Sequence, residues 1–188
     1  MHAPEAHIDL RGLPLRGGET STLLVEVTIS PLLLGGHRYA VVVQRDEAEV
    51  AVRRVTGGYL VTLRVHASVY GPCYRCLREV VLAVEAEQQE FVPHDLRTRQ
   101  AADDLSPFVE DHVVDVAGLA REAVVLALPD KILCSADCPG ICPHCGADLR
   151  EAACTCPPEE PDPRWDALRP LLAEPPAAEG PPSAAGPR

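Results

Sequence analysis

The sequence predicts an α+β fold, in which an antiparallel sheet is followed by a helix and by a C-terminal cysteine-rich zinc-binding segment. Three observations predict this fold. Apolar and polar residues alternate through much of residues 23–91, the apolar period changes to about 3.6 residues over 116–127, and six of the eight cysteines stand within 133–156. A chain of 188 residues is long enough to bury one hydrophobic core without disulfides.

The sheet is predicted to begin with two short strands and a hairpin. Apolar residues occupy every second position of residues 23–29, and a short apolar run follows at 39–43. Residues 50–55 and 59–70 then flank the turn sequence Thr56-Gly57-Gly58. Paired glycines between two β-branched runs predict a hairpin, because both central positions of its tight turn need a positive φ.

The strand after the hairpin completes the predicted sheet. It runs from Arg78 to about Phe91, and its outward residues include Glu79, Glu85 and Glu87. One face of this strand and of the strand before it is apolar, so we expect that face to point into the core. The expected inward residues are Tyr59, Val61, Leu63, Val65, Ala67, Val69, Val80, Leu82, Val84 and Ala86.

A long loop and one helix are predicted after the sheet. Residues 93–112 are polar and acidic, contain two prolines and show no sustained period, so we expect a surface loop. Helical spacing starts at residue 116, where Asp115 can cap the helix, and Pro129 ends it. The expected buried face of the helix carries Val116, Leu119, Ala120, Ala123, Val124 and Ala127.

We expect residues 1–156 to form a single α+β zinc-binding domain. Beyond it, ten of the last 32 residues are proline, which is typical of a solvated coil. Within 157–172, Asp162-Pro163 has the composition of a helix start, and we expect a short helix there that folds back on the domain through Trp165. Residues 173–188 are expected to be a disordered Pro/Ala-rich tail.

The composition predicts a cytoplasmic protein. Residues 1–20 are too polar for the apolar core of a secretory signal, and no apolar run approaches the roughly 18 to 20 residues of a membrane span. The cytosol keeps thiols reduced, so a cysteine cluster there indicates metal binding or redox chemistry more than disulfides.

The spacing of the eight cysteines is typical of metal binding. Two closely spaced pairs commonly hold one tetrahedral zinc ion, because each pair forms a tight turn whose sulfur atoms converge. Cys142-Pro-His-Cys145-Gly146 has the spacing of a zinc knuckle, in which the glycine supplies a positive φ. Four pairs predict two four-cysteine centres. These pairs are Cys73 and Cys76, Cys134 and Cys138, Cys142 and Cys145, and Cys154 and Cys156.

The distances along the chain predict which pairs share a metal ion. Eleven residues separate Cys142 from Cys154, so the last two pairs can wrap one local centre. The pair at Cys73 is then left for the pair at Cys134, and this centre would join the sheet to the end of the helix. Each zinc would have four thiolate ligands and no open position for water, so it would be structural and not catalytic.

A different class of protein is also consistent with the first pair, namely a cytoplasmic thiol oxidoreductase that uses Cys73 and Cys76. Against it, no βαβ pattern surrounds the pair, and the pair does not begin a helix, where a thiolate would be stabilised. We recognise no catalytic Ser/His/Asp arrangement, phosphate loop or convergent carboxylate pair. We therefore expect no enzymatic activity and no small-molecule substrate.

Several motifs occur in a characteristic order. They are the turn Cys73-Tyr-Arg-Cys76-Leu77, the helix end Val125-Leu-Ala-Leu-Pro129, the cluster from Leu133 to Leu149, the CxC pair and Asp162-Pro-Arg-Trp165. In this order the chain resembles the YceD-like family of large ribosomal RNA subunit accumulation proteins. The resemblance covers residues 10 to 172, and the segment of helix and cluster is its most specific part.

The resemblance implies a bacterial, non-enzymatic factor that is needed for normal accumulation of 23S ribosomal RNA. Its implied partners are 23S rRNA or large-subunit precursor particles, bound directly or through ribosomal proteins, and no membrane. Some members of the family keep the first cysteine pair without the later cluster, which implies that the two groups are separable. A zinc-ribbon adapter for a partner outside the ribosome is a further alternative.

The charge of the chain bears on RNA binding. The formal net charge is −11, whereas a general phosphate-binding protein is basic. Locally, residues 50–78 contain no Asp or Glu, and Tyr70 and Tyr74 are available to stack on bases. The alternative is that these arginines offset nearby thiolates or face solvent. The candidate RNA-binding residues are Arg53, Arg54, Arg64, Arg75 and Arg78.

Overall fold

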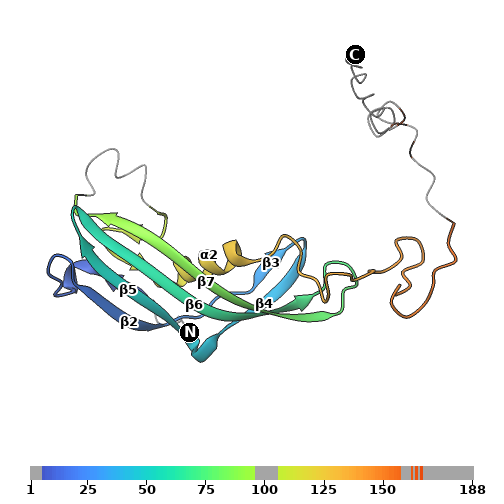
Figure 1. The fold of residues 1–188 in the computed structure, drawn as a ribbon, viewed down its shortest axis with the longest axis horizontal. Coiled ribbons are helices and arrows are strands. Elements are labelled where there is room, and N and C mark those ends of the chain that lie inside the picture. The colour runs from blue at the N-terminus through green and yellow to red at the C-terminus, as the bar shows by residue number, and fades with distance from the viewer. Residues whose placement is uncertain (1–5, 96–105, 158–161, 163, 165, 167–188) are drawn as a thin grey trace, which may run out of the picture. The chain divides into compact units, whose positions relative to one another are not determined.

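The main sheet is entirely antiparallel in the computed structural model, which describes residues 6–95, 106–157, 162, 164 and 166. Contacts divide the chain into residues 1–153 and 154–188, and the fold below is that of the first unit (Figure 1). The strands of this sheet are β2 (Thr20–Glu26), β3 (Leu32–Leu34), β4 (His37–Val43), β5 (Glu47–Val55), β6 (Gly58–Pro72) and β7 (Glu79–Pro93).

The 15-residue strand β6 is the centre of the sheet. Along one edge it pairs first with β5, from Gly58 to Arg64, and then with β4, from Ala67 to Tyr70. Along its other edge it pairs with β7 over the whole length of both strands. Strand β2 extends the sheet beyond β5, and β3 extends it beyond β4. Strand β6 therefore pairs with β4, β5 and β7, and it forms the predicted hairpin with β5.

The predicted inward face is confirmed as the core. Val61, Leu63, Val65 and Val69 are at most 1% exposed, and each fully buried side chain of this size stabilises the fold by about 1.5–3 kcal/mol. The helix α2 (Val116–Ala127) packs on β6 and β7 and covers this face. Its buried residues are Val116, Leu119, Ala120, Ala123 and Val124, as the helical spacing predicts. The prediction is wrong for Ala127, which is exposed because it is the last residue of the helix.

Both predicted ends of α2 are confirmed. The Asp115 carboxylate accepts a 2.9 Å hydrogen bond from the Gly118 amide, which satisfies one of the unpaired N–H groups of the first turn. The helix ends at Ala127, two residues before Pro129. No helix within the described residues is long and apolar enough to span a membrane.

The hairpin between β5 and β6 differs in detail from the prediction. Its two turn residues are Thr56 and Gly57, because Val55 already pairs with Gly58, and of these only Gly57 has a positive φ, of 87°. Gly58 is required for another reason. A Cβ atom there would lie 2.2 Å from the carbonyl oxygen of Val92, so only glycine allows β7 to approach this closely.

The predicted loop over 93–112 is partly wrong, because a small second sheet includes some of it. This sheet has the order β1-β9-β8, and no prediction covered it or strand β3. Strands of two or three residues are too short to show a period of two. Residues 96–105 lie outside the described residues. The additional elements are β1 (His7–Asp9), β8 (Val109–Glu110), β9 (Val113–Asp115) and the 3-10 turns η1 (Leu10–Gly12) and η2 (Gln44–Asp46).

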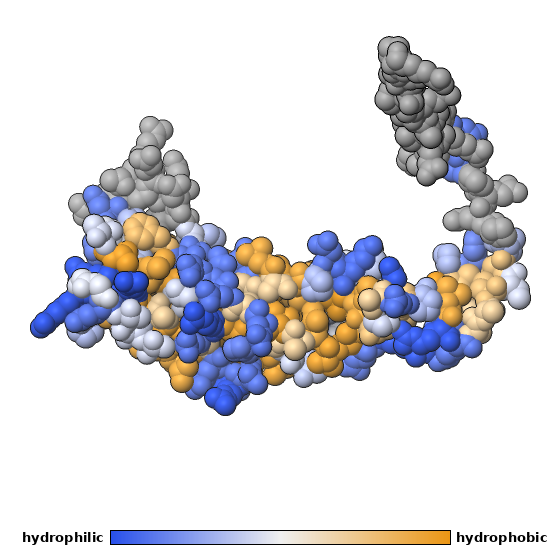
Figure 2. Space-filling view, in the orientation of Figure 1, coloured by the Kyte–Doolittle hydropathy of each residue, from blue (hydrophilic) through white to orange (hydrophobic). Residues whose placement is uncertain are grey.

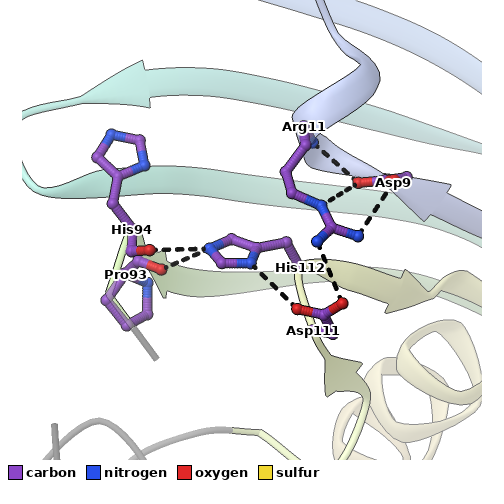
Figure 3. A network of polar contacts seen from close by, with 6 residues as sticks. All are labelled: Asp9, Arg11, Pro93, His94, Asp111 and His112. Atoms are coloured by element: carbon purple, nitrogen blue, oxygen red, sulfur yellow. Dashed lines mark hydrogen bonds and ion pairs between the residues drawn. The ribbon is translucent and has the colours of Figure 1, made fainter. Parts of the chain in front are cut away.

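A polar network joins this second sheet to the end of β7 (Figure 3). The Nε2 atom of His112 lies 3.1 Å from the Pro93 carbonyl oxygen and 3.2 Å from that of His94. Arg11 forms ion pairs of 3.1 Å with Asp9 and with Asp111. Asp111 and His112 both have a positive φ, of 44° and 63°. These contacts therefore stabilise a backbone conformation that residues other than glycine rarely adopt.

The predicted helix over 157–172 and the tail over 173–188 lie almost entirely outside the described residues. Among the described residues of this region, the Asp162 carboxylate accepts hydrogen bonds from the Arg164 amide over 3.0 Å and from its guanidinium. An N-cap residue accepts a bond of this kind. The predicted return of Trp165 to the domain stays a prediction.

Candidate metal centres

The first predicted cysteine group is assembled at one end of the sheet. Cys73 and Cys76 lie in the turn between β6 and β7, and Cys134 and Cys138 follow α2. The four sulfur atoms all lie within 4.8 Å of one another, with 3.8 Å between Cys73 and Cys138 and 3.6 Å between Cys76 and Cys134. The structure therefore groups the two pairs that the distances along the chain assigned to each other.

The backbone of the first pair has the geometry of a metal knuckle. The Leu77 amide donates to the Cys73 carbonyl over 3.0 Å, and the Cys73 amide donates to the Arg78 carbonyl over 2.7 Å. Leu77 follows the second cysteine and has a φ of 61°. A left-handed conformation costs a residue with a side chain roughly 1–2 kcal/mol, and here it turns amide groups toward the sulfur atoms.

The second pair is held against this knuckle by backbone contacts. The Tyr74 amide donates to the Ile132 carbonyl over 2.8 Å, just before Cys134. The Arg75 guanidinium donates to the Cys138 carbonyl over 2.8 Å, and the Arg75 carbonyl accepts from Ile141 over 3.2 Å. The sulfur atoms are therefore positioned by chain segments on both sides of the group.

The electrostatics of this group favour a thiolate at Cys73. Burial is the largest influence and raises the pKa of Cys73, but amide groups of Cys76, Cys134 and Arg75 that bond its sulfur lower it to about 6. For Cys76, the Arg78 amide is the largest influence and lowers the pKa, whereas burial and the neighbouring sulfur atoms together raise it to about 12. The Cys73 thiol thus ionises first. Its negative charge then opposes ionisation of Cys76 unless a cation lies between them.

An arginine completes the surroundings of Cys134. The Nη2 atom of Arg150 lies 2.9 Å from the Cys134 sulfur. Burial is the largest influence on the pKa of Cys134 and raises it, but the Arg150 bond and the bonds with Cys138 and Cys76 lower it overall. The sulfur contact raises the pKa of Arg150 in turn. This guanidinium can stabilise the excess negative charge of a metal ion held by four thiolates.

The first group has the donors of a closed, tetrahedral metal site. Cys73 and Cys138 are fully buried, Cys76 is 7% exposed and Cys134 is half-buried. Four sulfur donors that are shielded in this way, with amide groups directed at them, fit a metal ion that has no position left for water.

The second predicted group is local in the sequence. The sulfur atoms of Cys142, Cys145, Cys154 and Cys156 also lie within 4.8 Å of one another. The predicted positive φ of Gly146 is confirmed at 72°, and its amide donates to the Cys142 carbonyl over 2.9 Å. This turn repeats the backbone pattern of Leu77 and Cys73.

Four of the five candidate RNA-binding arginines have partners within the protein. Arg64 forms ion pairs with Glu87 and Glu49 at 2.8 and 3.3 Å, so residues 50–78 are not free of acidic neighbours in space. Arg78 pairs with Asp148 and Glu151. The remaining contacts are those of Arg75 with Cys138 and of Arg54 with the Leu15 carbonyl and the Tyr59 ring.

Arg53 differs from the other four arginines. It is exposed on β5, and within the described residues no hydrogen bond or ion pair joins its side chain to another part of the chain. Sequence reasoning missed the role of Arg150, which stands among acidic and small residues 16 positions from Cys134. No local signal predicts such a contact, because it depends on how the two cysteine pairs are brought together.

The fold and the cysteine groups define a class of protein: an antiparallel sheet and one helix that support two four-cysteine sites able to hold metal ions. The family model described as large ribosomal RNA subunit accumulation protein YceD matches residues 61–172, which include most of β6, all of β7 and α2, and all eight cysteines. The chain belongs to this family.

The curated relatives are mycobacterial proteins whose printed names call them uncharacterised. One from Mycobacterium tuberculosis is 34% identical over 132 residues, which are 67% of this chain and 61% of that protein. One from Mycobacterium leprae is 30% identical over 127 residues, which are 66% of this chain and 58% of that protein. The chain thus spans less than two thirds of the length of either relative. No solved structure matches the chain.

Proposed function

We propose that this protein is a non-enzymatic bacterial factor that supports the synthesis, processing or stability of 23S rRNA by binding RNA or a ribosomal protein. The observation that carries the proposal is the family match over residues 61–172, since the family is named for accumulation of the large ribosomal RNA subunit. Membership of this family supports the ribosome-related role. The non-enzymatic character and the binding partners are part of the proposal.

The proposal includes two structural zinc ions. Zinc prefers tetrahedral sites with thiolate ligands, and each four-cysteine group offers such a donor set. At the first centre, Cys73 and Cys76 from the sheet and Cys134 and Cys138 from beyond the helix would hold one ion. That ion would supply no chemistry beyond cross-linking the fold, because the four thiolates occupy its coordination positions.

Direct RNA contact would involve the exposed arginines. Arg53 is the best candidate, because the other four are engaged within the protein. If Arg53 contacts a phosphate, Arg53→Ala weakens binding to precursor 23S transcripts. It also reduces the steepness of log affinity against log salt concentration by about the amount that one phosphate contact contributes. An unchanged salt slope would assign the contact surface to another part of the protein.

The alternative function is that of a thiol oxidoreductase that uses Cys73 and Cys76, and the observation that favours it is that these two cysteines lie in one turn with their sulfur atoms within 4.8 Å of each other. A reactive cysteine is normally accessible, whereas Cys73 is fully buried and lies among three other thiols. Thiol titration of anaerobically purified protein separates the two functions. Metal-protected thiols support the binding factor, and a readily reversible Cys73–Cys76 disulfide without metal supports the oxidoreductase.

The direct test of the binding role is sedimentation of the intact protein in a lysate of its own cells. The proposal expects it to co-sediment with large-subunit precursors and to shift to the top of the gradient when those particles are dissociated by high salt. A protein that remains at the top of the gradient in low salt would contradict the proposal.

A further inference from the structure

Strand β7 forms a long edge of the main sheet. Its 15 residues pair with β6, and no other described strand lies along its second edge. Natural proteins usually blunt such an edge with charged side chains, above all Lys, with a bulge, a short length or an internal Pro. The register of β7 is continuous and its proline is the terminal residue Pro93, so of these devices β7 has only the charges of its Glu residues.

The hydrogen bonds at both ends of the β6–β7 ladder define which amide and carbonyl groups of β7 point away from β6, toward the open edge. The Cys73 amide donates to the Arg78 carbonyl, and the His94 amide donates to the Gly57 carbonyl. In an antiparallel ladder, hydrogen-bonded pairs alternate with pairs whose amide and carbonyl groups point away. Counting in steps of two from both ends gives the same residues with groups that face the open edge: Glu79, Val81, Ala83, Glu85, Glu87, Gln89 and Phe91.

These same residues carry the outer face of β7, opposite the core. Val81 is 57% exposed and Phe91 is 51% exposed, and Glu85 and Glu87 lie between them. Glu87 pairs with Arg64 of β6 on the side away from the open edge, and Glu85 lies 3.7 Å from the His66 ring, so the acidic residues of the strand still outnumber their basic neighbours. The strand contains four Glu residues and no Lys or Arg. Its open edge is therefore acidic at its start and in the middle, with the apolar residues Val81 and Phe91 on either side of the middle. Figure 2 shows hydrophobic and hydrophilic surface interleaved over the face of the molecule that it draws.

The charges decide between possible occupants of this edge. RNA is repelled by a row of carboxylates. A second copy that paired β7 with β7 about its middle would place Glu85 opposite Glu87 twice, and like charges directly opposite each other are destabilising. A basic polypeptide segment has the complementary charge and can use the open backbone groups.

We propose that the open edge of β7 binds an extended, basic segment of a protein partner as an added strand. The segment would carry Lys or Arg at two alternate positions beside Glu85 and Glu87, with apolar residues toward Val81 and Phe91. Main-chain hydrogen bonds supply affinity in this mode and the alternate side chains supply specificity. The inference rests on the proposed function only in that the partner would be a component of large-subunit assembly.

Two variants remove the proposed contact in different ways. Ala83→Pro deletes an amide that faces the open edge, so it blocks strand addition while sparing the ladder to β6. Glu85→Lys with Glu87→Lys reverses the charge of the edge and carries the test if the proline variant fails to fold. The matched control is Glu26→Lys with Glu47→Lys, an exposed pair of neighbours on β2 and β5 with the same change in charge.

The experiment places a photo-crosslinking amino acid at Val81 of the full chain in its own cells, and mass spectrometry identifies the attached segments. We expect segments of basic, strand-forming composition, with a yield that falls about tenfold in both edge variants and is unchanged in the control. Crosslinks to RNA, to a second copy or to nothing would overturn the proposal, as would a yield that survives Ala83→Pro. Failure of the proposed function is a separate result. It would appear in the sedimentation experiment, as wild-type protein that does not co-sediment with large-subunit precursors.

Discussion

At the scale of single residues, the sulfur contact of Arg150 is the feature with the clearest consequence. Its guanidinium lies 2.9 Å from Cys134 and is the charged group that lowers the pKa of that thiol. We expect Arg150→Ala to speed removal of the first metal ion by a chelator on the order of tenfold, because groups outside the ligand set tune affinity by this much. The rate is measured by release of the ion into a coloured indicator.

The control for this prediction is Arg53→Ala, which removes the same charge from an exposed position on β5. It should leave the rate of metal release unchanged. Equal rates for wild type and Arg150→Ala would mean that the contact with Cys134 contributes nothing to holding the ion.

The grouping of the cysteines makes a second prediction at this scale. Elemental analysis of purified protein should approach two zinc ions per chain, and Cys142→Ser should lose one of them. Cys142→Ser combined with Cys154→Ser should still retain one ion, because both residues belong to the second group. A double variant without any metal would show that the two cysteines serve different centres.

At the scale of elements, the close approach of β7 to the start of β6 is the most sensitive packing contact. Gly58→Ala would place a Cβ atom 2.2 Å from the Val92 carbonyl oxygen, so we expect it to lower the free energy of unfolding by about 1–3 kcal/mol. Gly17→Ala is the control, since its Cβ would meet nothing within 4 Å. Chemical denaturation of both variants measures the difference, and equal stability would argue against the close approach.

The elements also show how far a sequence of this kind predicts its fold. The long strands β6 and β7 and the helix α2 were predictable, because each buries one face over many residues and so repeats a clear period. The strands β1, β3, β8 and β9 have two or three residues each, and their pairing depends on partners far along the chain.

The candidate site divides in the same way. The eight cysteines and Gly146 were predictable, because metal ligation and a left-handed turn require particular residue types at fixed spacing. The left-handed Leu77 was not, since a leucine gives no signal of a positive φ. The acidic partners of Arg64 were equally hidden, because Glu49 and Glu87 come from neighbouring strands.

At the scale of the whole molecule, the first cysteine group connects the tip of the β6–β7 hairpin to the chain beyond α2. Its contacts join residues 65 and 58 positions apart, whereas the second group spans Cys142 to Cys156. Closure of a longer loop restrains the unfolded chain more, although the gain grows slowly with length. We expect Cys76→Ser to lower the midpoint of thermal unfolding more than Cys142→Ser does. Equal midpoints, or a lower one for Cys142→Ser, would contradict this order.

The central claim is that the protein supports accumulation of 23S rRNA, and the ratio of 23S to 16S rRNA in depleted cells tests it most directly. We expect the ratio to fall when the protein is depleted, the wild-type chain to restore it, and Cys76→Ser not to restore it. A ratio that stays unchanged after complete depletion, in cells that grow at the normal rate, would contradict a role in accumulation of 23S rRNA.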